Sequence, residues 1–236
     1  MKDLDRSARF AVSFVLEENE KTPVTVQKGA HKTPVWIQRA WEDGEFATYI
    51  RNNGCGHCCC AMALRLCGIP DVTPYDEYVH CRTLWGPPDE AKGQYHFLSV
   101  YGALRSLRSY GVTAEAYGVA PNGVCEAVDH IVESLARGCL VIFDSAPLRE
   151  DNPFSPGAHY VLLVGLADSG EIVVANSSNR ARTPTLGIQT VGREALEQAL
   201  DPKGCNPKTH DLTWGVLCPY EEKIGYIVID PEGKRA

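Results

Sequence analysis

The sequence lacks a long apolar run. Its longest apolar stretch, Tyr160 to Leu166, has the length of a β-strand, whereas a bilayer-spanning helix needs about 18–20 apolar residues. The short apolar segment 8–16 lies between Asp3 and Asp5 on one side and a run of glutamates on the other, which is not the pattern of a signal peptide. We therefore expect a cytoplasmic protein that makes no membrane contact, although a secreted chain trimmed of its signal would look the same.

The chain also lacks a cluster of lysines and arginines, and its formal net charge is −7. Nucleic acids and anionic membranes bind to basic patches, so neither is expected to be the main partner. The sequence says nothing about the oligomeric state. The spacing of Phe10, Phe14 and Val15 predicts an amphipathic helix over the segment 8–16.

A second Cys-x-x-Cys pair at zinc-ligand spacing is missing, although the chain has ten cysteines. Cys58, Cys59, Cys60 and Cys67 crowd one predicted helix, where neighbouring side chains point in different directions. Cysteines placed in this way behave as small core residues rather than as a disulfide framework. We expect no metal and no cofactor.

No change of composition divides the 236 residues, which predicts one domain with a 44% hydrophobic content. Helical periodicity dominates the middle of the chain and strands dominate from His159 onward, which indicates an α+β domain. The predicted segments are, in order, strands 22–27 and 33–36, helices 55–67, 74–83 and 97–109, strand 112–117, helix 124–135, strands 139–143, 160–166 and 172–176, helix 193–200, and strands 214–217 and 224–229.

Cys55 follows the turn signal Asn52-Asn53-Gly54 and opens the helix 55–67. The first N–H groups of a helix have no internal partner and carry the positive end of its dipole, so they favour a thiolate. Two chemistries fit. Cys55-Gly56-His57-Cys58 matches a dithiol redox motif, with Cys55 attacking and Cys58 resolving. Alternatively, Cys55 is a lone nucleophile, which needs a histidine base and an orienting group.

His159 begins a strongly hydrophobic strand, and the next strand ends on Asn176. If Ala167 pairs with Gly170 in the turn between them, Val161 pairs with Asn176. Asn176 then lies diagonally across from His159 on the same face of the sheet, with Cβ atoms within ~8 Å. An amide in that position bonds one ring nitrogen and leaves the other for Cys55. In a thioredoxin-like unit the Cys-x-x-Cys motif follows a buried strand. In this chain the preceding residues 46–54 are polar and turn-like, so the redox alternative is weaker.

Three separated motifs resemble the papain-like peptidases of the bacteriocin-processing family, which cleave leader peptides after a double glycine, and their stand-alone relatives. The motifs are Cys55-Gly56-x4-Ala61-Met62-x-Leu64, Leu135-Ala136-x-Gly138-x-Leu140-Val141-Ile142 and Gly157-x-His159-x-Val161-x-x-x-Gly165. The similarity covers residues 52–200. It implies a single papain-like domain, with residues 1–50 as an N-terminal extension, 52–200 as the family-like core and 201–236 as C-terminal strands.

The resemblance implies a bacterial cysteine peptidase in which Cys55 is the nucleophile, His159 the base and Asn176 the orienting group. The family usually has aspartate in place of Asn176, and a glutamine before the cysteine as oxyanion donor. No glutamine lies between Gln38 and Cys55, so Asn52 or Asn53 takes that role in this interpretation. The substrate would be a peptide or another amide.

Three alternatives stay open at this point: a thiol–disulfide oxidoreductase that uses Cys55 and Cys58, a catalytically inactive binding module, and an acyl-transferring or deamidating enzyme on the same fold. The loops 85–93 and 148–156 are predicted to form the cleft walls. Their acidic residues would disfavour acidic peptides; these residues are Asp89, Glu90, Glu150 and Asp151.

Overall fold

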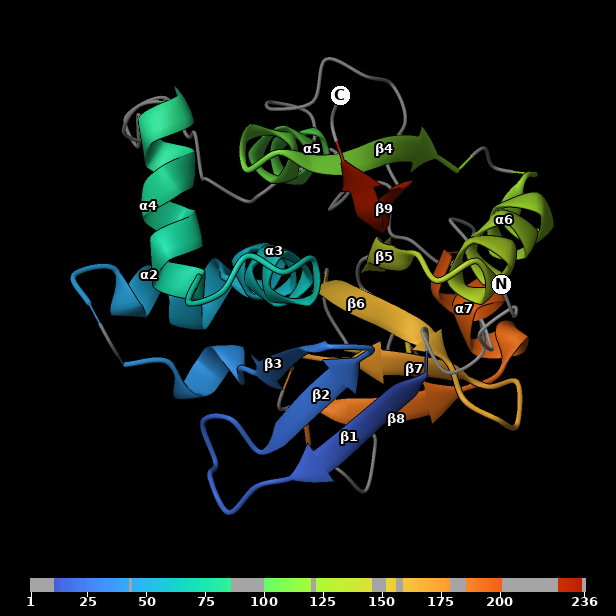
Figure 1. Ribbon diagram of the computed structural model, residues 1–236, viewed down its shortest axis with the longest axis horizontal. Helices are drawn as coiled ribbons and strands as arrows, with labels where there is room; N and C mark the ends of the chain where they lie inside the picture. Colours follow the sequence, from blue (N-terminus) through green and yellow to red (C-terminus); the bar gives the residue numbers. More distant parts are fainter. Residues whose placement is uncertain are drawn as a thin grey trace, which may run out of the picture.

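A six-stranded sheet forms the centre of this α+β protein, with the strand order β4-β9-β5-β6-β7-β8 (Figure 1). The computed structural model describes residues 11–42, 44–85, 100–119, 122–145, 152–155, 159–178, 186–200 and 225–234. Every pairing in the sheet is antiparallel. Its strands are β4 (Val112–Gly118), β5 (Leu140–Ser145), β6 (His159–Leu166), β7 (Ile172–Ala175), β8 (Ile188–Val191) and β9 (Gly225–Lys234).

Helices cover both faces of this sheet because both faces are apolar. Alternate residues of β6 divide between two core clusters: Leu162 and Val164 belong to one, and Val161 and Leu163 to the other. The first cluster contains α3 (Cys55–Leu66) and α5 (Val100–Ser109), and the second contains α6 (Val124–Ala136) and α7 (Arg193–Leu200). The helix that carries Cys55 therefore packs on one face of the strand that begins with His159.

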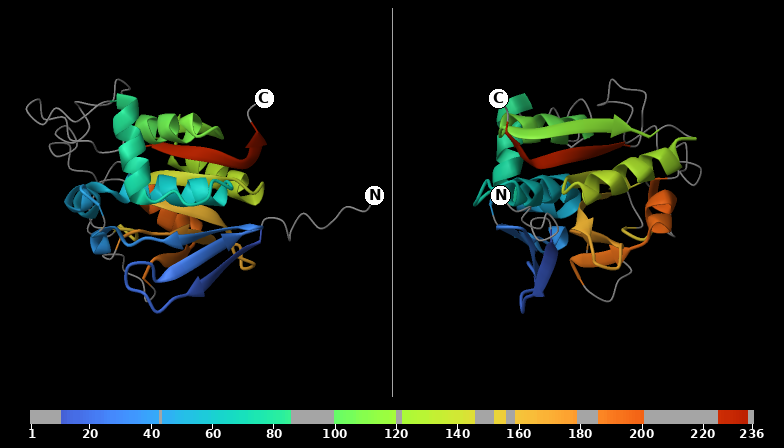
Figure 2. Two further views of the ribbon diagram at one scale, coloured as in Figure 1. Left: turned by 60° about the vertical axis from the view of Figure 1, so that its left-hand side comes forward. Right: turned by 45° about the vertical axis from the view of Figure 1, so that its right-hand side comes forward.

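A second, three-stranded sheet precedes the helices. Its strands are β1 (Val12–Leu16), β2 (Val24–Lys28) and β3 (His31–Val35), paired antiparallel in chain order. Figure 2 shows this sheet at the end of the molecule away from β4 and β9. The strands predicted at 22–27 and 33–36 are confirmed as β2 and β3. The helix predicted over 8–16 is wrong from Val12 onward, because β2 offers β1 a full ladder of backbone partners.

Residues 46–54 are not the polar turn that the sequence suggested. Ala47–Asn53 form helix α2, and the Gly54 N–H donates to the Ile50 carbonyl, so that α3 begins immediately after it. Ile50 is fully buried, which explains why a short helix without acidic residues in its first turn is stable here. The nucleophile candidate thus sits at a junction of two helices.

The other predicted helices are confirmed with shifts of a few residues at their ends. Pro74–Trp85 form α4, which crosses α3 (Figure 2). Gly111 and Gly138 have φ values of 84° and 91°, as the predicted glycine C-caps of α5 and α6 require. Strand β8 was not predicted. The predicted strand 214–217 lies outside the described residues, and the C-terminal strand, β9, pairs between β4 and β5.

The register between β6 and β7 brings Asn176 to the predicted position by a different route. Leu166 pairs with Ile172 near the turn, one residue away from the predicted register. An irregularity between Leu163 and Gly165 corrects this shift, so that Leu162 pairs with Ala175. Continuing that ladder by one residue places Asn176 opposite Val161, as the sequence predicted.

Candidate active site

Cys55 is the first residue of α3 and is partly buried. Its thiol lies beside the backbone N–H groups of Tyr160, Gly56 and Cys55 itself, and these groups act to lower its pKa. Tyr160 follows His159 directly in β6, so this contact places the sulfur next to the start of that strand. The packing of α3 on β6 brings these two motifs together.

Burial nevertheless outweighs the helix terminus in setting the acidity of this thiol. Desolvation raises the pKa of Cys55 to about 11, and the nearby Asp144 carboxyl acts in the same direction. Burial therefore opposes the thiolate that the helix N-terminus favours. The thiols of Cys58, Cys59 and Cys60 are more strongly affected, because burial raises the pKa of each well above its usual range.

His159 and Asn176 are in direct contact. The distance between Nε2 of His159 and Oδ1 of Asn176 is 2.8 Å, and both residues are buried. The direction of this bond is fixed by the other bonds of the amide: Nδ2 of Asn176 donates to the Phe154 carbonyl and to Oε1 of Gln189. Since Oδ1 can only accept, Nε2 of His159 carries the proton and Nδ1 is left as the basic nitrogen.

Gln189 fixes this network one step further from the ring. Its own Nε2 donates to the Pro153 carbonyl, which turns Oε1 toward Asn176. Burial lowers the pKa of His159 to about 4, while the bond to Asn176 acts in the opposite direction. The imidazole is therefore neutral at physiological pH and able to accept a proton.

The Cys55 sulfur lies beside the backbone of Tyr160, the residue that follows His159 in β6. Among the described residues, no hydrogen bond joins this sulfur to the His159 ring. Burial acts against the charged form of both the Cys55 thiol and the His159 imidazole, and so disfavours a thiolate–imidazolium pair.

The two asparagines predicted as oxyanion donors lie in the last turn of α2. Asn52 is exposed and Asn53 is partly buried. Within the described part of the chain, neither side chain makes a hydrogen bond. The predicted cleft walls fall mostly outside the described residues, apart from Trp85 at the end of α4 and the segment 152–155.

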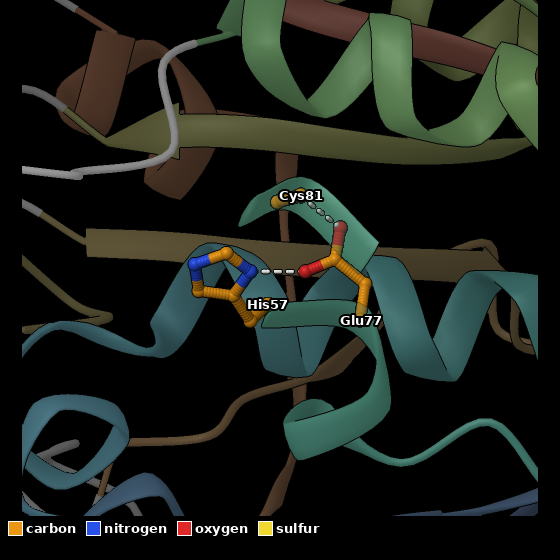
Figure 3. A group of neighbouring side chains, drawn as sticks. All are labelled: His57, Glu77 and Cys81. Carbon is orange, nitrogen blue, oxygen red and sulfur yellow. Dashed lines mark hydrogen bonds and ion pairs between the residues drawn. The ribbon is translucent and has the colours of Figure 1, made fainter. Parts of the chain in front are cut away.

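A buried hydrogen-bonded network begins at His57, two residues after Cys55 in α3 (Figure 3). The sequence analysis did not predict it. His57 of α3 donates from Nδ1 to Glu77 of α4, and Glu77 also accepts from Cys81 at 3.0 Å and from Ser106 at 2.8 Å. Although desolvation opposes the charged form, these partners lower the pKa of Glu77. The network joins the first turn of α3 to α4 and α5.

The same residues form the one group in the described chain with potential metal-ligand geometry, since atoms of His57, Glu77 and Cys81 lie within 4.8 Å of one another. Protein donors already occupy both oxygens of Glu77, and Figure 3 shows the second ring nitrogen of His57 turned away from it. Nε2 of His57 is buried and has no hydrogen-bond partner among the described residues. The i, i+4 spacing of Glu77 and Cys81 was the available sequence signal.

No protein-family model and no curated protein sequence matches this chain. One similar solved structure is a double-glycine-motif protease from an AMS/PCAT transporter, in complex with the leader peptide. The match has a TM-score of 0.40 and 14% sequence identity, and it covers 94% of this chain and 93% of that chain. No helix among the described residues is long and apolar enough to cross a membrane.

Proposed function

We propose that this protein is a cysteine-dependent hydrolase of peptide or other amide bonds that acts through a thioester on Cys55. The observation that carries the proposal is the hydrogen bond from Nε2 of His159 to Oδ1 of Asn176, which leaves Nδ1 of His159 as the basic nitrogen. His159 directly precedes Tyr160, whose backbone N–H lies beside the Cys55 sulfur. A nucleophile, a base and a group that orients the base are the parts that such chemistry needs. Their resemblance to the motifs of papain-like peptidases supports the same assignment.

In this mechanism, Nδ1 of His159 takes the thiol proton as the Cys55 sulfur attacks the carbonyl carbon. The carbonyl electron pair moves to oxygen and then returns as the amine leaves with the proton from His159. Water then attacks the thioester carbon while His159 takes a proton from that water. The carbon–sulfur bond breaks, the carboxylic acid leaves, and His159 returns the proton to the Cys55 sulfur. Asn176 keeps the ring in the tautomer that allows each transfer.

The dithiol alternative receives less support from the same geometry. Cys58 is fully buried, and burial raises the pKa of its thiol well above the usual range, so it is poorly suited to attack a mixed disulfide. The motif also follows helix α2 rather than a buried strand. Acyl transfer and deamidation would use the same three residues as hydrolysis.

Incubation of the purified protein with a peptide library, followed by sequencing of new termini, tests the proposal. We expect cleavage by the wild type and by Cys58→Ala, and none by Cys55→Ala or His159→Ala. Cys125→Ala is the matched control, because Cys125 is exposed on α6. Cleavage that survives Cys55→Ala would contradict the proposal. Conversion of glutamine side chains without cleavage would identify deamidation, and disulfide reduction lost in Cys58→Ala would identify redox exchange.

A further inference from the structure

Tyr49 carries a buried hydroxyl that has no hydrogen-bond partner. The residue lies in α2, and its ring is held between the first turn of α3 and helix α4. It stacks on Tyr78 with ring centroids 4.6 Å apart, and its centroid is 6.2 Å from that of His57. The hydroxyl itself is buried, although Tyr49 as a whole is partly exposed.

Unsatisfied buried hydroxyls are costly and call for a physical reason. Other buried polar atoms also lack a partner: Nε2 of His57, whose ring centroid is 6.2 Å from that of Tyr49, Oδ1 of Asp144, whose carboxyl acts on the Cys55 thiol, and Oγ of Ser177, which follows Asn176 in sequence. Polar atoms gathered without partners around a candidate nucleophile indicate a place where a polar ligand binds. A substrate carbonyl that becomes an oxyanion supplies the acceptor that Tyr49 lacks.

We infer that the Tyr49 hydroxyl is the side-chain donor that stabilises the oxyanion formed when Cys55 attacks a substrate carbonyl. This inference rests on the proposed function. When the carbon–sulfur bond forms, the π-electron pair of the carbonyl moves to oxygen, which then accepts hydrogen bonds from the Tyr49 O–H and the Cys55 N–H at the start of α3. On collapse, the pair returns and the leaving group departs.

The acidity of Tyr49 suits this role. Burial, followed by the charges of neighbours that include Cys55, raises the pKa of Tyr49 well above its usual range. The hydroxyl therefore stays protonated and remains a donor at every pH at which the site works. Asn52, in contrast, is exposed to solvent.

Two reactions of the Cys55 sulfur distinguish a loss of oxyanion stabilisation from a loss of nucleophilic reactivity. Acetylation of Cys55 by p-nitrophenyl acetate passes through a tetrahedral oxyanion, whereas alkylation by iodoacetamide is a displacement that forms none. Tyr49→Phe keeps the ring and removes only the hydroxyl. We expect it to lower the acetylation rate by ~10²–10³-fold, as the loss of one oxyanion donor does in other enzymes. The alkylation rate should not change.

Tyr75→Phe is the matched control, since Tyr75 belongs to the same aromatic group through Phe46. Equal acetylation of wild type and Tyr49→Phe would overturn the inference, and so would a parallel loss of both reactions, which would mean that Tyr49 positions Cys55. Loss of acetylation in Asn53→Ala or Asn52→Ala alone would give the role to that residue. If wild-type Cys55 is alkylated but never acetylated, the proposed function itself fails.

Discussion

His159 and Asn176 form a hydrogen bond with only one possible direction. Oδ1 of Asn176 receives the Nε2 proton because the amide nitrogen of Asn176 is bonded to the Phe154 carbonyl and to Gln189. The tautomer of the histidine is thereby determined by residues of three different segments: 152–155, β8 and the end of β7. In the proposed mechanism, Asn176 is the group that orients the His159 imidazole.

Removal of the Asn176 side chain should weaken the enzyme without removing its base. In Asn176→Ala, the His159 ring loses its fixed tautomer, and we expect kcat to fall by ~10²–10⁴-fold, less than for His159→Ala. Steady-state cleavage rates measure this loss. Asn122→Ala is the control, because Asn122 is exposed and distant in sequence from the site. An unchanged kcat in Asn176→Ala would show that the bond has no catalytic role.

Alkylation of Cys55 should accelerate with pH up to the alkaline range. Its pKa of about 11 means that the reactive thiolate increases about tenfold per pH unit below that value. A plateau near pH 6 would instead reveal a preformed thiolate–imidazolium pair. Rates of iodoacetamide labelling across pH, with peptide mapping, distinguish the two.

Asp144 should influence the pH dependence of Cys55 alkylation. Its carboxyl raises the pKa of Cys55, so Asp144→Asn should move labelling to lower pH and make it several-fold faster at a given pH. Asp168→Asn, at an exposed turn, is the control for loss of a negative charge. Burial raises the pKa of Asp144 itself, so the shift is expected only at pH values where that carboxyl is ionised. A profile that does not move at any pH in Asp144→Asn would contradict the prediction.

Acid should destabilise the fold through His159. The unfolded histidine binds a proton near pH 6.5 and the folded one only near pH 4, so the unfolded state holds more protons between these values. Stability is therefore lost as the pH falls from 6.5 to 4, by on the order of 3 kcal/mol. Urea unfolding of His159→Gln should lack this component, whereas His31→Gln, an exposed site, should retain it. Parallel pH profiles for wild type and His159→Gln would contradict it.

The Glu77 network should be structural and independent of metal. Glu77→Gln replaces one acceptor oxygen by an NH2 group, which then faces either His57 or the pair Cys81 and Ser106, and it removes the charge that His57 bonds. We expect a loss of about 3–5 kcal/mol in the free energy of unfolding, as when one partner of a buried pair is removed. Glu18→Gln, on the surface, should change it by less than about 0.5 kcal/mol. Thermal unfolding with and without EDTA is the second measurement, and a lower midpoint in EDTA would indicate a bound metal.

Local patterns were sufficient to predict the elements that carry Cys55, His159 and Asn176. A glycine-containing turn before an apolar helix and two strands joined by a short turn are signals within a few residues. The register of Asn176 was predicted correctly only because the irregularity near Val164 compensates for a turn that differs by one residue. That compensation has no sequence signal that we recognise.

What the sequence did not predict depends on contacts between distant segments. Strand β1 forms because β2 pairs with it, and its Phe14, Val15 and Leu16 remain exposed, so its apolar spacing also fits a helix. The partners of Glu77 come from α3, α4 and α5, and no local spacing connects His57 with Glu77. The sequence also did not indicate Tyr49, because residues 46–54 have the composition of a turn and Ala47–Asn53 form helix α2 instead.

The central claim is that Cys55 forms a thioester with the help of His159. The most direct measurement is acid-quenched peptide mapping after brief exposure to p-nitrophenyl acetate. We predict one acetyl thioester, located on Cys55, that turns over in the wild type and does not form in His159→Ala. Acetylation at another cysteine, or an equal rate in His159→Ala, would contradict the assignment.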